Sequence, residues 1–166
     1  MSSWFERLKE LGIELPQVAA PVAAYVPAIQ VGQQVWTSGQ LPFVDGELPV
    51  VGKVADTTDI DVADTSYVSV DKAKEQARIA TLNALAAVDS LVGLDNVARV
   101  VKVVGFVSSA AGFHGQPGVV NGASELLGEI FGEAGQHARS AVGVAELPLN
   151  SPVEIELIVE LAAERP

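Results

Sequence analysis

The last stretch of the sequence constrains the fold most strongly, because residues 153–161 read VEIELIVEL. Apolar residues occupy the odd positions, and Glu154, Glu156 and Glu160 share the even ones. Side chains along a β-strand point alternately to opposite faces of the sheet. The pattern therefore predicts a strand with one apolar and one acidic face, and its apolar face needs a second layer to cover it.

Two long helices are predicted to supply that layer. Residues 71–92 place small and apolar side chains on one helical face, namely Ala73, Ala77, Ala80, Ala84, Val88 and Leu91. Because most of this stripe is alanine, the helix can lie close to a sheet. Residues 117–134 predict the second helix, which Gly135 ends.

The remaining elements are shorter. Runs of β-branched and apolar residues predict strands at 33–38, 97–107 and 140–147. The run 97–107 is too continuously apolar to alternate, so we expect both of its faces to be buried. Asp45-Gly46 indicates a hairpin turn, and the spacing of apolar residues predicts a short helix over 3–12.

These elements predict an α+β fold: a mixed β-sheet with two main helices packed on one face, plus a short N-terminal helix. A chain of 166 residues suits a single domain, 1–166. Within it we expect an N-terminal helical extension at 1–20 and an exposed insertion at 52–69, which is rich in Asp and Thr. A sheet covered on one face only must bury its other face elsewhere, which favours an oligomer.

Composition excludes several classes of site and partner. The chain has no cysteine and two histidines, so thiolate sites and histidine-rich metal sites are excluded, and we expect no metal. No phosphate-binding or dinucleotide-binding motif is present, so we expect no cofactor. The net charge of −11, with only 10 Lys and Arg residues, disfavours nucleic acid as a partner.

The sequence also predicts where the protein resides. No apolar run reaches the roughly 18 residues that a membrane-spanning helix needs, so no membrane association is expected. The first ten residues, MSSWFERLKE, lack the basic and then apolar pattern of a secretory signal. We therefore expect a soluble protein of the cytoplasm.

Two charged residues are candidates for chemistry. Arg139 is the only Lys or Arg between Lys102 and Arg165, and its neighbours are small or apolar. A guanidinium in that position can hold a carboxylate through two parallel hydrogen bonds, although a surface ion pair with a glutamate is the alternative. Glu154 can position or activate a water, unless the acidic face of its strand is simply solvated.

Other residues are candidates for binding. Ser38-Gly39 follows a predicted strand, where a freed backbone N–H can donate to a ligand oxygen, whereas no motif supports a serine nucleophile. Tyr25 and Asn121 can either line a site or serve the local structure. His137, beside Arg139, either gates a site or caps the preceding helix.

Three blocks of sequence together resemble the RidA/YjgF family of reactive intermediate deaminases, which is also described as L-PSP endoribonuclease-like. The first is AAYV followed by VGQQVWTSGQLP, the second is PGVVNGASELLGEIFGE, and the third is ARSAVGVAELP followed by VEIELIVE. They occur in the family's order and span roughly residues 21–160. This resemblance implies a chorismate-mutase-like fold and a homotrimer with clefts between subunits.

The resemblance also implies an activity and a site. Active members hydrolyse reactive 2-imino and 2-enamino acids to 2-keto acids and ammonia without a cofactor, as 2-iminobutanoate/2-iminopropanoate deaminases do. By this similarity Arg139 holds the substrate carboxylate and Glu154 positions the attacking water. The remaining contacts would be the backbone of Gly39 and Ala141 and the side chains of Tyr25, Ser38 and Asn121.

The sequence departs from the family pattern at several points. Ala141 stands where a cysteine is common, Gly143 where an acidic residue is usual, and His137-Ala138 where Pro-Ala is typical. With its N-terminal helix and insertion, the chain resembles a divergent, longer subgroup. Two alternatives to the deaminase stay open: a non-catalytic trimer that binds a small carboxylate in a regulatory role, and a ribonuclease, against which the acidic charge counts.

Overall fold

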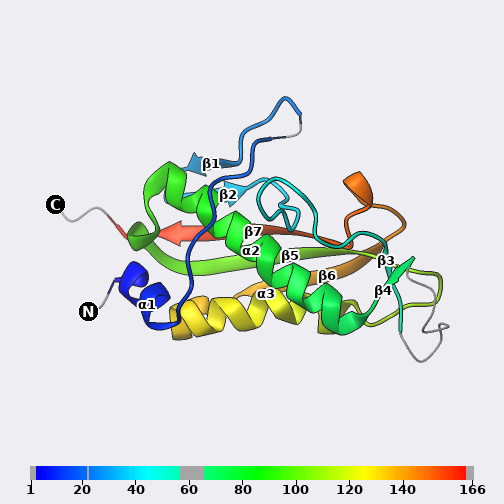
Figure 1. The fold of residues 1–166 in the computed structure, drawn as a ribbon. Helices are drawn as coiled ribbons and strands as arrows, with labels where there is room; N and C mark the ends of the chain where they lie inside the picture. Colours follow the sequence, from blue (N-terminus) through cyan, green and yellow to red (C-terminus); the bar gives the residue numbers. More distant parts are fainter. Residues whose placement is uncertain (1–2, 22, 57–65, 164–166) are drawn as a thin grey trace.

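The protein is described by a computed structural model, which covers residues 3–21, 23–56 and 66–163 (Figure 1). Across these ranges no helix has both the length and the apolar character to cross a membrane. The central part of the insertion expected at 52–69, residues 57–65, lies outside the described residues.

A five-stranded mixed sheet forms the centre of the structure. Its strands, in spatial order, are β1 (Ala28–Val31), β2 (Gln34–Thr37), β7 (Val153–Leu161), β5 (Val97–Ser108) and β6 (Ala138–Val144). All neighbours are antiparallel except β5 and β6, which are parallel. The last strand, which the alternation predicted, is the middle strand of the sheet. Its apolar face is buried and its glutamates lie on the other side, as expected.

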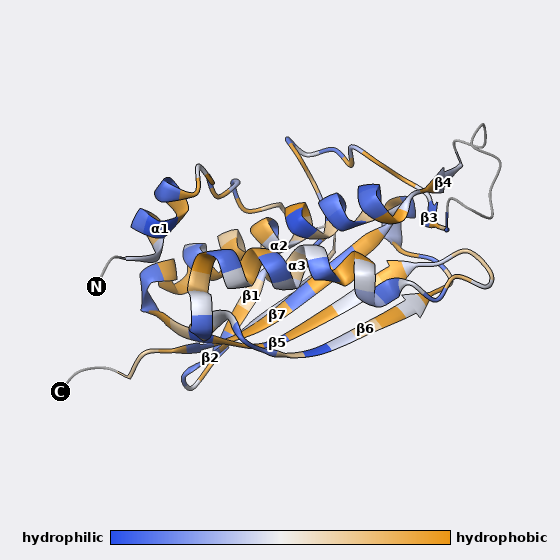
Figure 2. Cartoon of the chain, turned by 90° about the horizontal axis from the view of Figure 1, so that it is seen from below, coloured by the Kyte–Doolittle hydropathy of each residue, from blue (hydrophilic) through white to orange (hydrophobic). Residues whose placement is uncertain are grey.

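Two helices, α2 (Val70–Val92) and α3 (Gln116–Phe131), cover one face of this sheet (Figure 2). This layering confirms the predicted arrangement. The hydroxyl of Ser69 caps α2 by accepting a hydrogen bond from the backbone N–H of Lys72 at 3.2 Å. Ala73, Ala77 and Ala80 are fully buried in the core, as their stripe predicted.

The short helix α1 (Trp4–Glu10) packs at one end of the helical layer. The indole N–H of Trp4 donates to the Val97 carbonyl at 2.8 Å, and its ring meets that of Phe131 edge to face at 4.9 Å. Leu8 of α1 is buried in the core. The N-terminal segment is therefore anchored to the start of β5 and the end of α3.

The strand β5 corrects one prediction. Val100, Val103 and Val107 are fully buried under the helices, whereas Val104 and Phe106 on the opposite face are only partly covered. The expectation that both faces are buried is therefore wrong for a single chain. The reason is that the helices cover one side of the sheet only, although the sequence of β5 is apolar on both.

The ends of the 52–69 segment correct a second prediction, that this segment is an exposed insertion. Strands β3 (Lys53–Val54) and β4 (Tyr67–Val68) pair in parallel there. Val54, Ala55 and Val68 are buried, and Val54 forms a bridge to Ser109 after β5. An exposed connection is therefore the wrong interpretation of these flanking residues, because their apolar side chains complete the core.

The helix-free face of the sheet remains open. Large apolar side chains stand exposed there, including Ile29 and Val31 on β1, Trp36 on β2 and Val142 on β6. The pairing Ile29–Trp36–Ile158 runs across three strands on this face. A single chain therefore leaves a broad apolar surface uncovered beside the row of glutamates on β7.

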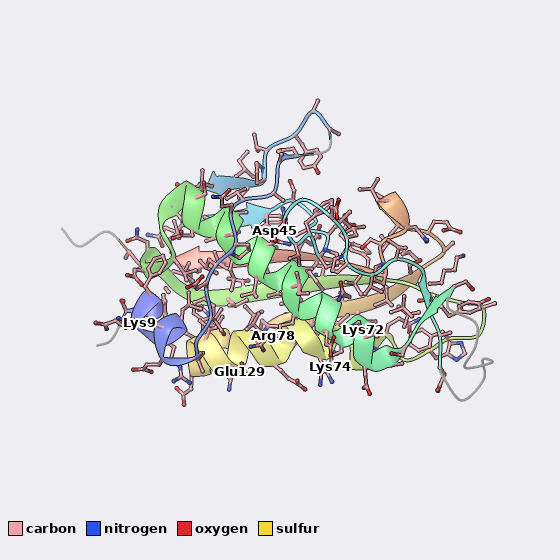
Figure 3. All side chains as sticks on the ribbon, viewed as in Figure 1. Lys9, Asp45, Lys72, Lys74, Arg78 and Glu129 are labelled. Carbon is pink, nitrogen blue, oxygen red and sulfur yellow. The ribbon has the colours of Figure 1, made fainter. Side chains whose placement is uncertain are left out.

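The contact between α2 and α3 is close because of a glycine. A Cβ at Gly122 would overlap the carbonyl oxygen of Lys74 on α2. On the outer side of the same seam Lys74 pairs with Glu125 and Arg78 with Glu129, at 2.9 and 3.1 Å (Figure 3). These ion pairs are exposed and contribute little, so the glycine contact sets the helix spacing.

We expect Gly122→Ala to lower the free energy of unfolding by about 1–3 kcal/mol, because the methyl group forces two backbones apart. Gly128→Ala, in the same helix with open space around its Cβ, is the matched control. It should raise the free energy of unfolding by roughly 0.5–1 kcal/mol through helix propensity. Urea denaturation of both variants measures the difference, and a stabilised Gly122→Ala protein would contradict the close contact.

Candidate functional site

Four of the predicted site residues line one cleft. Tyr25, Ser38, Gly39 and Glu154 surround a cavity of about 470 Å³ next to the start of β7. Tyr25 comes from the chain before β1, Ser38 and Gly39 follow β2, and Glu154 is the second residue of β7. The cavity lies within the size range of small-molecule sites.

Gly39 lies directly against the carboxylate of Glu154. The chain after β2 stays paired to β7, since Gln40 and Ile155 exchange backbone hydrogen bonds of 2.7 and 3.0 Å. A Cβ at Gly39 would lie 2.7 Å from both Cδ and Oε1 of Glu154. A side chain at position 39 would therefore displace this carboxylate from its place. The N–H of Gly39 finds no acceptor within the described part of the chain.

Ser38 holds the wall of the cleft. Its hydroxyl donates to the Val26 carbonyl at 2.6 Å, and its N–H donates to the Pro27 carbonyl at 2.8 Å. The hydroxyl hydrogen is therefore committed to the backbone, which agrees with the absence of a nucleophilic serine motif. The Tyr25 side chain is 43% exposed at the mouth.

The rest of the lining is mostly apolar and was not predicted from the sequence. It consists of Ala19, Ala20, Pro21, Ala23, Pro27, Gln40, Leu41, Phe43 and Pro148. Five of these nine residues belong to the segment between α1 and β1. That segment has no helical or strand period, so nothing in its pattern indicated that it lies over the cleft.

The environment of Glu154 disfavours its charge. Burial raises the pKa of Glu154, and the nearby carboxylate of Glu156 raises it further. Burial also raises the pKa of Glu156, but the Lys102 ammonium opposes that shift. The pKa of Glu154 is therefore higher than that of an exposed glutamate, and no cation is among the causes that set it. A raised pKa of this kind is typical of acid–base groups at functional sites.

Arg139 and Asn121 form a second cluster. Arg139 lies on the edge strand β6, and its Nη1 donates to Asn121 Oδ1 at 2.7 Å and to Ser124 Oγ at 3.2 Å. Its Nη2 donates to the Pro117 carbonyl at 3.4 Å. Among the described residues Arg139 makes no ion pair, so the alternative of a surface pair with a glutamate finds no partner in the chain.

Two further residues belong to this cluster. Ala141 is two positions after Arg139 on the same, helix-facing side of β6. The Nδ1 of His137 lies 2.6 Å from the Gly135 carbonyl, and its Nε2 lies 2.9 Å from Ser124 Oγ. His137 thus caps the turn after α3 and also contacts the arginine's partner. Ser124 had no distinguishing sequence signal.

The two clusters lie on opposite faces of one sheet. Arg139 is in register with Val103, whose side chain is buried under the helices, and Glu154 is in register with Phe106 on the open face. One chain therefore does not bring Arg139 to Glu154. No group of three or more His, Asp or Glu side chains suited to a metal occurs in residues 3–21, 23–56 and 66–163.

Known proteins share both the sequence and the fold. The sequence model of the family described as "YjgF/chorismate mutase-like, putative endoribonuclease" matches residues 5–161. A crystal structure of a putative endoribonuclease from Shewanella oneidensis is 35% identical with a TM-score of 0.86, covering 96% of this chain and 100% of that one. This likeness confirms the expected chorismate-mutase-like fold.

Two curated relatives extend the comparison. Protein TCP17 of Trypanosoma cruzi is 40% identical over 156 residues, which is 93% of this chain and 91% of that protein. A 2-iminobutanoate/2-iminopropanoate deaminase of Dermatophagoides farinae is 32% identical over 148 residues, 89% of this chain and 93% of that protein. With the family match over most of its length, the chain belongs to the YjgF/chorismate mutase-like family, also known as RidA.

Proposed function

We propose that this protein is a cofactor-free deaminase that hydrolyses reactive 2-imino and 2-enamino acids to 2-keto acids and ammonia. The observation that carries the proposal is the state of Arg139. Its guanidinium is held by neutral acceptors, with no carboxylate of the described chain against it. Its positive charge is therefore left for an anionic ligand.

The hydrogen bonds of Arg139 also determine which of its N–H groups remain available for a ligand. Nη1 directs its two hydrogens at Asn121 and Ser124, and Nη2 has one long bond to Pro117. The Nε–H donates to no group of the described chain. In a guanidinium the Nε–H and one hydrogen of Nη2 are parallel and match the two oxygens of a carboxylate. Such a clamp orients a 2-imino acid by its carboxylate and leaves the imine carbon free to react.

We further propose that the active cleft forms between subunits of a homotrimer. Within one chain Arg139 and Glu154 are on opposite faces of the sheet, and the open face is apolar and uncovered. Strand β6 is an edge of the sheet. A closed ring of identical chains covers such a face and brings Arg139 of one subunit to Glu154 of the next.

In this cleft hydrolysis needs one activated water. The carboxylate of Glu154 accepts a proton from the water as its oxygen bonds to the imine carbon, and the C=N electrons pass to nitrogen. Return of that proton to nitrogen gives a carbinolamine. Glu154 then takes the proton of the carbinolamine hydroxyl and passes it to nitrogen. As the C–N bond breaks, the oxygen forms the keto group, so ammonia departs and the 2-keto acid remains. An enamine first takes a proton on its β-carbon to become the imine.

The relatives support this choice within the family. The relative from Dermatophagoides farinae is named as a 2-iminobutanoate/2-iminopropanoate deaminase, whereas two structural neighbours are named as putative endoribonucleases. The net charge of −11 opposes binding to an RNA backbone. We also propose a cytoplasmic location, which suits a chain that has no cysteine and needs no disulfide.

We expect Arg139→Ala to lower kcat/KM by about 100-fold or more, because the carboxylate clamp is lost. Arg139→Lys should recover only part of this, since an ammonium lacks the planar fork. Release of pyruvate from 2-iminopropanoate, generated from D-alanine by D-amino acid oxidase, measures the rate. Arg78→Ala, which removes an exposed ion pair on the helical layer, is the matched control and should keep wild-type activity.

Two results would redirect the proposal. An Arg139→Ala protein with unchanged activity would exclude the clamp. A wild-type protein that binds pyruvate but does not speed the loss of the imine would instead support a non-catalytic carboxylate-binding protein.

We expect activity to fall as the pH drops through the raised pKa of Glu154, because only the carboxylate accepts the water proton. Glu154→Gln should therefore be inactive at every pH. Glu156→Gln removes one of the two causes of the raised pKa, so it should move the acid limb of the pH–rate profile to lower pH. An acid limb that stays in place in Glu156→Gln would contradict this coupling.

We expect inactive subunits to complement each other if the cleft is shared. Arg139→Ala and Glu154→Gln proteins, unfolded together in equal amounts and refolded, should regain activity in about a quarter of their clefts, since each cleft then draws its arginine and its glutamate from different chains. Each variant refolded alone is the control. Failure of the mixture to regain activity, with trimers verified by light scattering, would contradict a cleft that combines Arg139 and Glu154 of different chains.

A further inference from the structure

Ser124 lies at the centre of the hydrogen bonds around Arg139. It is on α3, one turn after Asn121, so the two side chains share a face of the helix. Its Oγ lies 3.2 Å from Arg139 Nη1 and 2.9 Å from His137 Nε2. Three elements, namely α3, the turn after it and β6, therefore meet at one hydroxyl.

The Gly135 carbonyl fixes the hydrogen of the imidazole. A carbonyl oxygen can only accept, so the contact of 2.6 Å requires that His137 Nδ1 carries a hydrogen. In the neutral ring Nε2 is then the acceptor, and the Ser124 hydroxyl must donate to it. The oxygen lone pairs of Ser124 consequently face Arg139.

The arrangement does not depend on the charge of the imidazole. If Nε2 also carries a hydrogen, it donates to Ser124 Oγ, which has two lone pairs and still accepts from Arg139. In both states the serine is an acceptor for the guanidinium. In either state His137 therefore keeps the hydroxyl hydrogen of Ser124 directed away from Arg139.

The serine and histidine do not form a nucleophilic pair. Ser124 is in the middle of α3, where backbone N–H groups are used within the helix and supply no oxyanion hole. Its oxygen is also engaged by a cation on one side and an imidazole on the other. The geometry suits holding a neighbour in place rather than attacking a substrate.

We propose that Ser124 and His137 are positioning residues for the carboxylate clamp, a role that rests on the proposed function of Arg139. Together with Asn121, Ser124 takes both hydrogens of Nη1. This leaves the Nε–H and one Nη2–H as the pair that meets a ligand. Neutral acceptors achieve this without neutralising the guanidinium, which a glutamate in the same place would do.

The test uses pyruvate, the expected keto-acid product, as the probe in calorimetric titrations of the purified protein. Ser124→Ala should weaken pyruvate binding about tenfold, since it removes one hydrogen bond to a charged group. Ser124→Thr keeps the hydroxyl and should bind like the wild type. Ser90→Ala, the same change at an exposed site on α2, is the matched control.

If His137 acts through Ser124, the effects of the two substitutions on pyruvate binding should not add. A general loss of stability would not produce this pattern. His137→Phe alone should weaken binding about threefold, because the hydroxyl is then free to turn. The double variant with Ser124→Ala should bind no more weakly than Ser124→Ala alone, since the histidine acts only through the serine. Thermal unfolding of each variant verifies that it is folded.

The outcomes separate this inference from the proposed function. Unchanged binding in Ser124→Ala, with binding lost in Arg139→Ala, would overturn the positioning role and leave the clamp intact. Independent, multiplied losses in the double variant would overturn the role of His137. Unchanged binding in Arg139→Ala would remove the clamp and this inference together.

Discussion

The close packing of two helices on one face of the sheet is the constraint from which the rest of the structure follows. Small residues make it possible: buried alanines line α2, and Gly122 lets α3 approach the backbone of α2 at Lys74. The three α-helices of the described residues all belong to this layer, so none of them covers the other face of the sheet. On that face Ile29, Val31 and Trp36 stay exposed, and the proposed trimer would cover them with another copy of the chain.

The same constraint divides the chemistry. A strand residue must face either the helices or the open side, so Arg139 and Glu154 cannot meet within one chain. Within one chain the division keeps Arg139 and Glu154 from forming an ion pair. The position of Glu154 also affects stability. Because its pKa is raised in the folded protein, ionisation of Glu154 lowers the free energy of unfolding. The stability that protonated Glu154 contributes is complete below pH 4.5 and is lost as the pH rises through the raised pKa.

Local patterns in the sequence predicted local structure well. The alternation of β7 and the alanine stripe of α2 each follow from one period, and the structure confirms both. The faces of β5 could not be predicted, because apolar residues under a helix and apolar residues on an open face look alike in sequence. Grouping the candidate residues needed the topology, which places Tyr25, Ser38, Gly39 and Glu154 in one cleft and Asn121 with Arg139 elsewhere. Ser124 carried no signal at all.

The overall charge of the chain makes the local geometry of Arg139 decisive. At a net charge of −11 the protein as a whole repels an anionic 2-imino acid. Salt screens that repulsion beyond roughly 8 Å at physiological ionic strength, so a substrate that reaches the cleft feels mainly the groups in contact with it. Under the proposed function, an unneutralised guanidinium with two parallel donors is then the dominant local attraction for that substrate. Asn121 and Ser124 hold the guanidinium as neutral acceptors, so its charge is not neutralised by a carboxylate of the described chain.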